Sequence, residues 1–250
     1  MLFARRPNAM FKFNNKYTVE QAELMWRSIA FREHRQFAFF DGASSRWQHP
    51  KRTFDDFQEF YSYLCSQSIS DVHVKPLPDN GGREWVIDVD FEANTPPSLL
   101  DLKIRVAVRT FVAFYGNNVA RVLHSGNRGV HVWLKIDAFR LAADKELRRK
   151  HYKALAKPTK ISTQEVRAGS FIGCLRDVVR DPSLLADARR HFGGERVEES
   201  QLLLELWPPV DEHIFCNATT QIRAPFSYNY KGRQHQRLLW PQQCGSDSGR

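Results

Sequence analysis

The sequence predicts an α+β fold, and two observations indicate that class. Apolar and polar residues alternate in several short stretches, most clearly in EWVIDVDFE over residues 84–92, and a period of two is typical of strands. Stretches with helical periodicity stand among these strands, such as FDDFQEFYSYLC over residues 54–65. Strands and helices mixed in this order predict one α+β domain over residues 1–240.

The first half of the chain carries clear start and stop signals. Thr18 is a suitable helix N-cap, because its hydroxyl can accept a hydrogen bond from the first helical turn, and Pro76 ends a strand because it lacks an N–H. Pro96 and Pro97 begin a helix that Gly116 ends after Tyr115. The expected elements are helices at 18–31, 54–65 and 97–115, and strands at 36–41, from 72 to 76 and at 85–91.

A hairpin is expected next, with strands at 119–124 and 130–136 joined by the loop SGNRG. Residues 143–156 and 170–206 read as mainly helical and charged, so we expect a helical insertion at about 143–206. Strands are expected again within 210–240, and residues 241–250 are expected to form a disordered tail.

Composition narrows the function. The 250 residues carry 37 Lys and Arg against 28 Asp and Glu, a net charge of +9, which favours a polyanionic partner, although a merely basic surface would give the same count. The four cysteines include no CxxC pair, which argues against a disulfide framework and predicts a reducing compartment. No signal peptide and no apolar run of about 20 residues is present, so no membrane partner is expected.

The first candidate site is a pair of carboxylates on one strand. In EWVIDVDFE, Trp85, Ile87, Val89 and Phe91 share one face. Asp88 and Asp90 project from the other face, where side chains two residues apart can converge on divalent ions, and their hard oxygen ligands suit Mg²⁺ or Mn²⁺. A half-exposed strand with an acidic outer face would show the same pattern.

The second candidate site is the hairpin loop SGNRG and the strand that follows it. Glycine-rich backbone can direct N–H groups toward an anion, and Arg128 can form planar, charge-assisted hydrogen bonds with phosphate. Ser125 and His131 add further polar groups. An ordinary hairpin turn would also use Gly and Asn.

The third candidate site lies in DEHIFCNATTQIRAPFSYNYKGR, residues 211–233. Asp211 can complete a metal site, Arg223 can lie along a nucleotide phosphate, and Lys231 with Arg233 forms a basic turn suited to a template or a phosphate. A solvated charged loop is the alternative.

Together these motifs resemble the catalytic subunit of archaeo-eukaryotic-type DNA primases. That family has, in order, a strand with Asp-x-Asp, a loop of the form Ser-Gly-x-Arg-Gly-x-His, and a late Asp followed by a basic residue and Pro-Phe-Ser. The segments DVHVKP, REWVIDVDF, HSGNRGVHVWL and QIRAPFSYNYKG are similar to those of baculoviral late-expression-factor primases. The resemblance spans roughly residues 18–240 and implies a primase catalytic core with an RRM-like mixed sheet and flanking helices.

The resemblance also implies a role for each site residue and an activity. Asp88, Asp90 and Asp211 would hold two Mg²⁺ or Mn²⁺ ions, and Ser125, Arg128, His131, Arg223 and Arg35 would contact the incoming nucleoside triphosphate. The activity would be synthesis of short RNA primers on single-stranded DNA, with one metal ion activating the attacking 3′-hydroxyl and the other stabilising pyrophosphate.

Some positions depart from the cellular members of the family. Asn127 stands where a second Arg is usual and Asn229 near where a His is usual, so triphosphate binding would weaken unless Lys231 or Arg233 compensates. No structural zinc cluster is expected, since His213-x-x-Cys216 supplies only two ligands.

The implied partners are a single-stranded DNA template, nucleoside triphosphates, an accessory primase subunit that is a second late-expression factor, and a replisome helicase. The accessory subunit would dock on residues 143–206 or on an apolar face near the N-terminus, and the protein would act in the host nucleus.

Three other functions explain the motifs and the charge of the chain less completely. A nucleotide-sugar transferase also uses Asp-x-Asp, but it gives no reason for SGNRGVH or the basic charge. A non-catalytic single-strand DNA-binding factor would use the charge and the 12% aromatic content, yet it needs no paired aspartates. A P-loop ATPase is excluded because the sequence has no GxxxxGK[ST].

Overall fold

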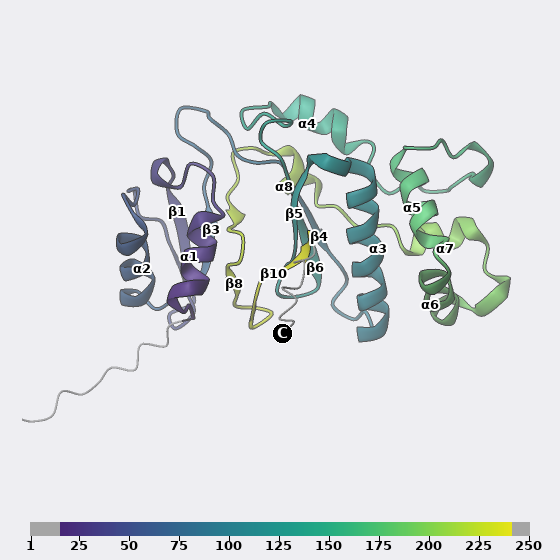
Figure 1. Cartoon of the computed structure of the whole chain (residues 1–250), viewed down its shortest axis with the longest axis horizontal. Helices are drawn as coiled ribbons and strands as arrows, with labels where there is room; N and C mark the ends of the chain where they lie inside the picture. Colours follow the sequence, from purple (N-terminus) through teal and green to yellow (C-terminus); the bar gives the residue numbers. More distant parts are fainter. Residues whose placement is uncertain (1–15, 242–250) are drawn as a thin grey trace, which may run out of the picture.

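The structure, a computed structural model, describes residues 16–241 and has the predicted α+β class. Its strands form two four-stranded sheets and a two-stranded ribbon, accompanied by eight α-helices in the described residues. Figure 1 shows the two sheets side by side, with α1 and α2 at one end and α3, then α5 to α7, at the other. The strand pairs of the described residues are all antiparallel, where the resemblance implied a mixed sheet.

The first sheet has the strand order β2-β1-β3-β7. Its strands are β1 (Phe37–Asp41), β2 (Arg46–Gln48), β3 (Ile69–Val74) and β7 (Ile222–Arg223), and its helices are α1 (Val19–Arg27) and α2 (Phe57–Ser66). Thr18 caps α1 as predicted, in a reciprocal capping box with Gln21. The α2 helix begins at Phe57, three residues later than the apolar pattern starts, because the side chain of Asp56 accepts a hydrogen bond from the Glu59 N–H as N-cap.

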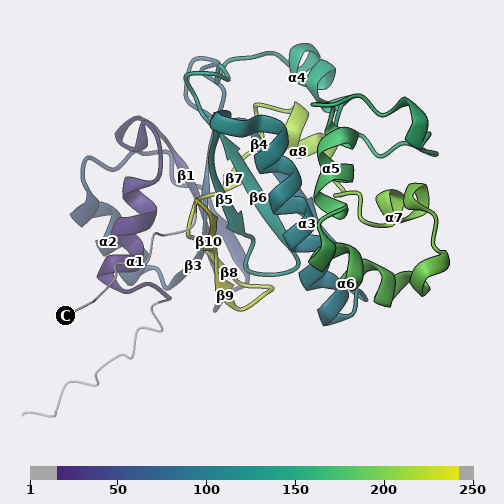
Figure 2. The ribbon, with the colours of Figure 1, turned by 45° about the vertical axis from the view of Figure 1, so that its right-hand side comes forward.

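The second sheet has the strand order β10-β5-β6-β4. Its strands are β4 (Val86–Asp90), β5 (Val119–His124), β6 (Gly129–Leu134) and β10 (Arg237–Trp240). The long helix α3 (Pro97–Tyr115) crosses one face of this sheet, as Figure 2 shows. The hairpin predicted at 119–136 is present, with its second strand β6 at Gly129–Leu134, and the C-terminal strand β10 pairs with β5 at its edge.

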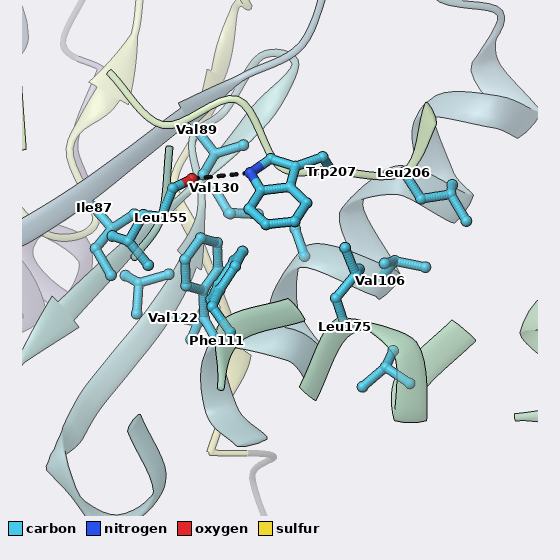
Figure 3. Packing of buried hydrophobic residues seen from close by; sticks show 14 of the residues in the cluster. Ile87, Val89, Val106, Phe111, Val122, Val130, Leu155, Leu175, Leu206 and Trp207 are labelled. Carbon is cyan, nitrogen blue, oxygen red and sulfur yellow. Dashed lines mark hydrogen bonds between the residues drawn. The ribbon is translucent and has the colours of Figure 1, made fainter. Parts of the chain in front are cut away.

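The main core lies between the second sheet and α3. Figure 3 shows Ile87 and Val89 of β4 among the buried side chains of this cluster, together with Phe111 of α3. Trp207, in the same cluster, donates a hydrogen bond from Nε1 to the carbonyl oxygen of Leu155 at 2.9 Å, so its one polar group is satisfied although the ring is buried.

The predicted helical insertion is helical in the structure. It contains α4 (Lys145–Tyr152), α5 (Phe171–Val179), α6 (Pro182–Phe192) and α7 (Glu199–Glu205). Residues 210–240 include a helix that the strand pattern did not predict, α8 (Glu212–Cys216), before the short ribbon of β8 (Tyr228–Asn229) and β9 (Gln234–His235). The expected tail lies outside the described residues from 242 onward. No helix within 16–241 is long and apolar enough to cross a bilayer.

A buried ion pair joins the two sheets. Arg35 lies two residues before β1 and Glu84 two residues before β4, and the Arg35 Nη1 and Nη2 atoms donate to the two Glu84 carboxylate oxygens at 2.6 and 3.0 Å. The remaining donors of Arg35 bond to the carbonyl oxygens of Lys75 and Ala30. Because the Arg35 side chain is 0% exposed and all its bonds are internal, it fixes the position of one sheet relative to the other.

Removing one member of this pair should destabilise the protein strongly. Arg35→Met leaves the Glu84 carboxylate buried without its partner, and the expected loss is about 3–5 kcal/mol of unfolding free energy. The double variant Arg35→Met/Glu84→Met removes both charges and should recover a large part of that loss. Urea unfolding of the two single variants and the double variant measures the coupling, and additive losses would contradict the proposed connection.

Candidate active site

A pocket of about 410 Å³ lies between the two sheets and the β8–β9 ribbon. It brings together five of the residues that the sequence singled out: Asp88, Asp90, Ser125, His131 and Arg223. It is further lined by Phe40, Trp47, Asp71, His73, Asn127, Ile214, Gln221, Ile222, Asn229, Tyr230 and Lys231. The pocket is therefore built from segments that are far apart in the sequence, and both sheets contribute to it.

The β4 strand places the two carboxylates in the pocket as its alternation predicted. Trp85, Ile87, Val89 and Phe91 belong to the core beneath α3. Asp88 and Asp90 point to the opposite face, where Asp88 pairs in register with His131 and Asp90 with Gly129. The Asp88 side chain is 25% exposed and that of Asp90 is 57% exposed, so Asp88 lies deeper in the pocket.

The environment of Asp88 opposes its negative charge. Burial raises the pKa of Asp88, and the nearby carboxylates of Asp211 and Asp90 raise it further, while His131 lowers it. The His131 Nε2 atom lies 3.4 Å from the Asp88 carboxylate, and the pKa of His131 is lowered mainly by burial. A divalent cation at this position would offset the clustered negative charge, and carboxylate oxygens suit Mg²⁺ or Mn²⁺.

Gln236 holds His131 from the other side. The Gln236 Nε2 and His131 Nδ1 atoms are 2.8 Å apart, in a buried contact that joins β6 to the residue preceding β10. With the amide as donor, the neutral imidazole carries its proton on Nε2, directed toward Asp88. Gln236 therefore sets the orientation in which His131 meets the carboxylate.

The loop after β5 is organised around the hydroxyl of Ser125. Its Oγ accepts hydrogen bonds from the backbone N–H groups of Asn127 and Gly129, at 3.3 and 3.1 Å. These two N–H groups are thus used within the loop, whereas the glycine pattern had suggested that loop N–H groups face an anion. Arg128 donates from Nε to the Phe91 carbonyl oxygen and from Nη2 to Asp90 Oδ2 at 3.0 Å. Arg128 is not among the residues lining the pocket, but its guanidinium is paired with Asp90, which does line it.

The ribbon of β8 and β9 fastens this loop in place. Asn229 donates from Nδ2 to the Ser125 carbonyl oxygen at 3.0 Å, and its Oδ1 accepts from the N–H groups of Lys231 and Gly232. A Cβ atom on Gly232 would lie 1.7 Å from the Gly126 carbonyl oxygen, so only glycine fits where the two segments meet. Asn229 therefore has a positioning role in this chain.

Arg223 reaches the pocket from β7 and is held by Asp71 of β3. Its Nη1 donates to the Asp71 carboxylate and to the Tyr228 carbonyl oxygen, the latter at 2.6 Å. Asp71 also accepts from Ser70 Oγ at 2.8 Å and from the Tyr230 N–H at 3.1 Å. The Asp71 side chain is only 5% exposed, so this buried network orients the guanidinium of Arg223. Asp71 and Arg223 belong to the first sheet, whereas Asp88 belongs to the second.

Asp211 adjoins the site through its backbone. Its N–H donates to the Asp88 carbonyl oxygen at 2.9 Å, but its carboxylate accepts from the Ile214 N–H and caps α8. Accordingly, residues 16–241 contain no group of three His, Cys, Asp or Glu side chains arranged closely enough to hold a metal ion. Asp88 and Asp90 fit a cation as a pair, and Asp211, whose Oδ1 caps α8, lies near enough to act on the charge of Asp88.

The prediction for Arg35 as a phosphate contact is corrected. Its guanidinium is fully buried, bonds to Glu84 and two carbonyl oxygens, and does not line the pocket. The sequence does not show whether a basic residue beside a strand binds a ligand or a carboxylate far along the chain. For Arg35 the partner is the carboxylate of Glu84.

Comparison with curated proteins gives two close relatives. The chain is 42% identical over 225 residues to a protein named DNA primase from Autographa californica nuclear polyhedrosis virus, which covers 89% of this chain and 81% of the relative. It is 42% identical over 231 residues to Late expression factor 1 of Orgyia pseudotsugata multicapsid polyhedrosis virus, covering 91% and 89%. The chain belongs to the baculoviral late-expression-factor primase family. A comparison with protein-family models finds no match.

The pocket also has lining residues to which the sequence analysis assigned no role. Asp71 and His73 alternate with Val72 and Val74 in DVHV, the same signal that located Asp88, but one strand alone does not show which face meets a ligand. Trp47 and Tyr230 also line the pocket. Trp47 lies in none of the segments that carry the resemblance, and Tyr230 lies in QIRAPFSYNYKG, where no role was implied for it.

His73 should make the stability of the primase depend on pH. Burial lowers the pKa of His73 well below the ordinary value, so the unfolded chain takes up a proton below about pH 6.5 that the folded chain does not. The unfolded state then binds more protons, and the unfolding free energy falls as the pH decreases from about 6.5, by up to about 1.4 kcal/mol per pH unit. Urea unfolding of wild type and His73→Leu between pH 7.5 and 5 should show a shallower slope in the variant. Parallel curves would contradict this role.

Proposed function

We propose that this chain is the catalytic subunit of a DNA primase that synthesises short RNA primers on single-stranded DNA during viral replication. One observation carries the proposal: Asp88 and Asp90 line the same pocket as Arg223, and Ser125 and Asn127 of the SGNRG loop line it as well. Carboxylates for a cation and basic groups for phosphates are the two requirements of nucleotidyl transfer. The family adds support, because a relative that is 42% identical is named DNA primase.

Asp88 and Asp90 would hold the divalent ions, Mg²⁺ or Mn²⁺, with Asp211 as the further ligand. The raised pKa of Asp88 supports this assignment, because a buried carboxylate among other acids is stabilised in its charged form by a cation. When bound, such ions supply Lewis-acid stabilisation to the attacking 3′-hydroxyl and to the pyrophosphate leaving group.

The remaining pocket residues would position the nucleoside triphosphate. Arg223 presents a fixed positive charge, because Asp71 and the Tyr228 carbonyl oxygen orient it, and Lys231 adds a second basic group at the ribbon. Ser125 and His131 supply polar groups near Asp88, and Arg128 would serve at the rim by exchanging Asp90 for a phosphate. In the reaction the 3′-hydroxyl of the primer would lose its proton to water, its oxygen would form a bond to the α-phosphorus, and the bond from that phosphorus to the departing pyrophosphate would break.

The proposed partners are a single-stranded DNA template, nucleoside triphosphates, an accessory subunit that is a second late-expression factor, and a replisome helicase, all within the host nucleus. The net charge of +9 supports a nucleic-acid partner. No zinc cluster is proposed. A non-catalytic single-strand DNA-binding factor would share that charge, but it would have no use for two carboxylates that line one pocket with a fixed arginine.

Replacing either carboxylate should abolish primer synthesis. The purified chain, with and without its accessory subunit, is incubated with single-stranded DNA, labelled ribonucleotides and Mg²⁺ or Mn²⁺. Asp88→Asn and Asp90→Asn should each lower the rate at least about a hundred-fold, because metal-ion stabilisation contributes several kcal/mol to the transition state.

Asp177→Asn is the matched control, since this carboxylate is 67% exposed on α5 and lies outside the pocket. It should retain the wild-type rate. Absence of primer synthesis by a folded, partner-bound wild-type chain would contradict the catalytic proposal. Primer synthesis that persists in both active-site variants would place the active site elsewhere.

A further inference from the structure

Three aromatic side chains line one side of the pocket without a role in the proposed metal or phosphate chemistry. We call Phe40, Trp47 and Tyr230 the aromatic wall. The ring centroids of Phe40 and Trp47 are 5.4 Å apart and those of Phe40 and Tyr230 are 5.2 Å apart, so the three rings form one contiguous surface. All three line the same pocket as Asp88.

The fold fixes where this wall lies. Phe40 of β1 pairs in register with Trp47 of β2 on one side and with Asp71 of β3 on the other, and Asp71 in turn holds Arg223. The Tyr230 ring lies against Gly42, where an added Cβ would approach it to 3.1 Å, and its backbone N–H is bonded to Asp71. The wall and the proposed phosphate-binding arginine are therefore held by the same carboxylate.

The wall is open to solvent. Trp47 and Tyr230 are 40% and 41% exposed. The other large hydrophobic residues with comparable exposure in residues 16–241 do not line the pocket. Single exposed apolar residues are common on protein surfaces. Two of them gathered at the mouth of a charged pocket instead indicate a surface that a flat ligand covers.

A second observation at the same place points to a ligand. His73 lines the pocket beside the wall, with its ring centroid 4.5 Å from that of Trp47. Both of its ring nitrogens are shielded from solvent and have no hydrogen-bond partner among the described residues. Buried polar atoms are normally paired, so an imidazole that lacks a partner beside an open pocket gains one if its ring turns to bring a nitrogen to an occupant of that pocket.

We infer that the aromatic wall binds a nucleobase by stacking, with His73 hydrogen-bonding to the nucleoside that carries it. The inference deepens the proposed function, on which it rests for the identity of the ligand as a nucleotide. Aromatic rings stack on the π-face of every base, so the wall would accept nucleotides without a strong sequence preference. Lys231, next to Tyr230 and also in the pocket lining, would meet the adjoining phosphate.

Equilibrium binding separates the wall from the phosphate site. The full-length chain is titrated in Mg²⁺ with three probes: a nucleoside triphosphate, inorganic tripolyphosphate, which has no base, and a single-stranded oligothymidylate. Trp47→Leu and Tyr230→Leu are compared with wild type and with Phe31→Leu, the matched control at an aromatic residue that is 46% exposed and lies outside the pocket. Trp47→Phe, which keeps an aromatic face, should restore binding.

We expect Trp47→Leu to weaken binding of a base-carrying probe about five- to a hundred-fold. Tripolyphosphate binding should stay within about two-fold of wild type, because the phosphate contacts remain. Weaker binding of the triphosphate alone would assign the wall to the incoming base, and weaker binding of the oligonucleotide alone would assign it to the template base.

Unchanged binding of both base-carrying probes in folded Trp47→Leu and Tyr230→Leu would overturn the inference, even if Asp88→Asn has abolished primer synthesis. Equally weakened binding of tripolyphosphate by the same variants would overturn the inference as well, because the substitution would then act on the phosphate contacts and not on the base. If wild type makes no primer yet its oligonucleotide binding depends on Trp47, the wall stands and the proposed catalysis fails.

Discussion

The buried pair of Arg35 and Glu84 is the interaction on which the pocket depends. The pocket has one wall from each sheet, so its shape is set by how the sheets are placed, and the pair connects the segment before β1 to the segment before β4. Buried charges are costly to desolvate, and this one is compensated only because every donor of Arg35 has an internal acceptor. An apolar contact of similar area would hold the sheets together less specifically, because it has no preferred direction.

Each carboxylate that lines the pocket through Asp71, Asp88 or Asp90 has a nitrogen-bearing side chain as its partner. Asp71 holds Arg223, Asp90 is bonded to Arg128, and His131 lies beside Asp88. Charges of both signs are thus kept close together before any ligand arrives. Under the proposed function this arrangement is useful, because a nucleotide with its metal ions would bring charges of both signs, and the more exposed pair of Asp90 and Arg128 could be exchanged for contacts with the ligand.

The parts of the site that follow a strand period could be predicted from the sequence, and the parts that depend on pairing between distant segments could not. The alternation of EWVIDVDFE placed Asp88 and Asp90 on one face because the strand is buried on the other. Asp71 follows the same rule, yet its importance appears only once β3 is paired with β7 and the guanidinium of Arg223 lies beside it. The α8 helix has five residues, too few to show a helical period, and the capping role of Asp211 was hidden with it.

The contact between Gly232 and Gly126 has a consequence for how this family can change. Since a side chain on Gly232 would overlap the Gly126 carbonyl oxygen, the ribbon and the SGNRG loop are constrained as one unit although more than a hundred positions of chain separate them. A substitution at Gly232 is tolerated only when the loop shifts, and a longer loop is tolerated only when the ribbon withdraws. The two segments should consequently vary together among homologues, so that a change in one is accompanied by a change in the other.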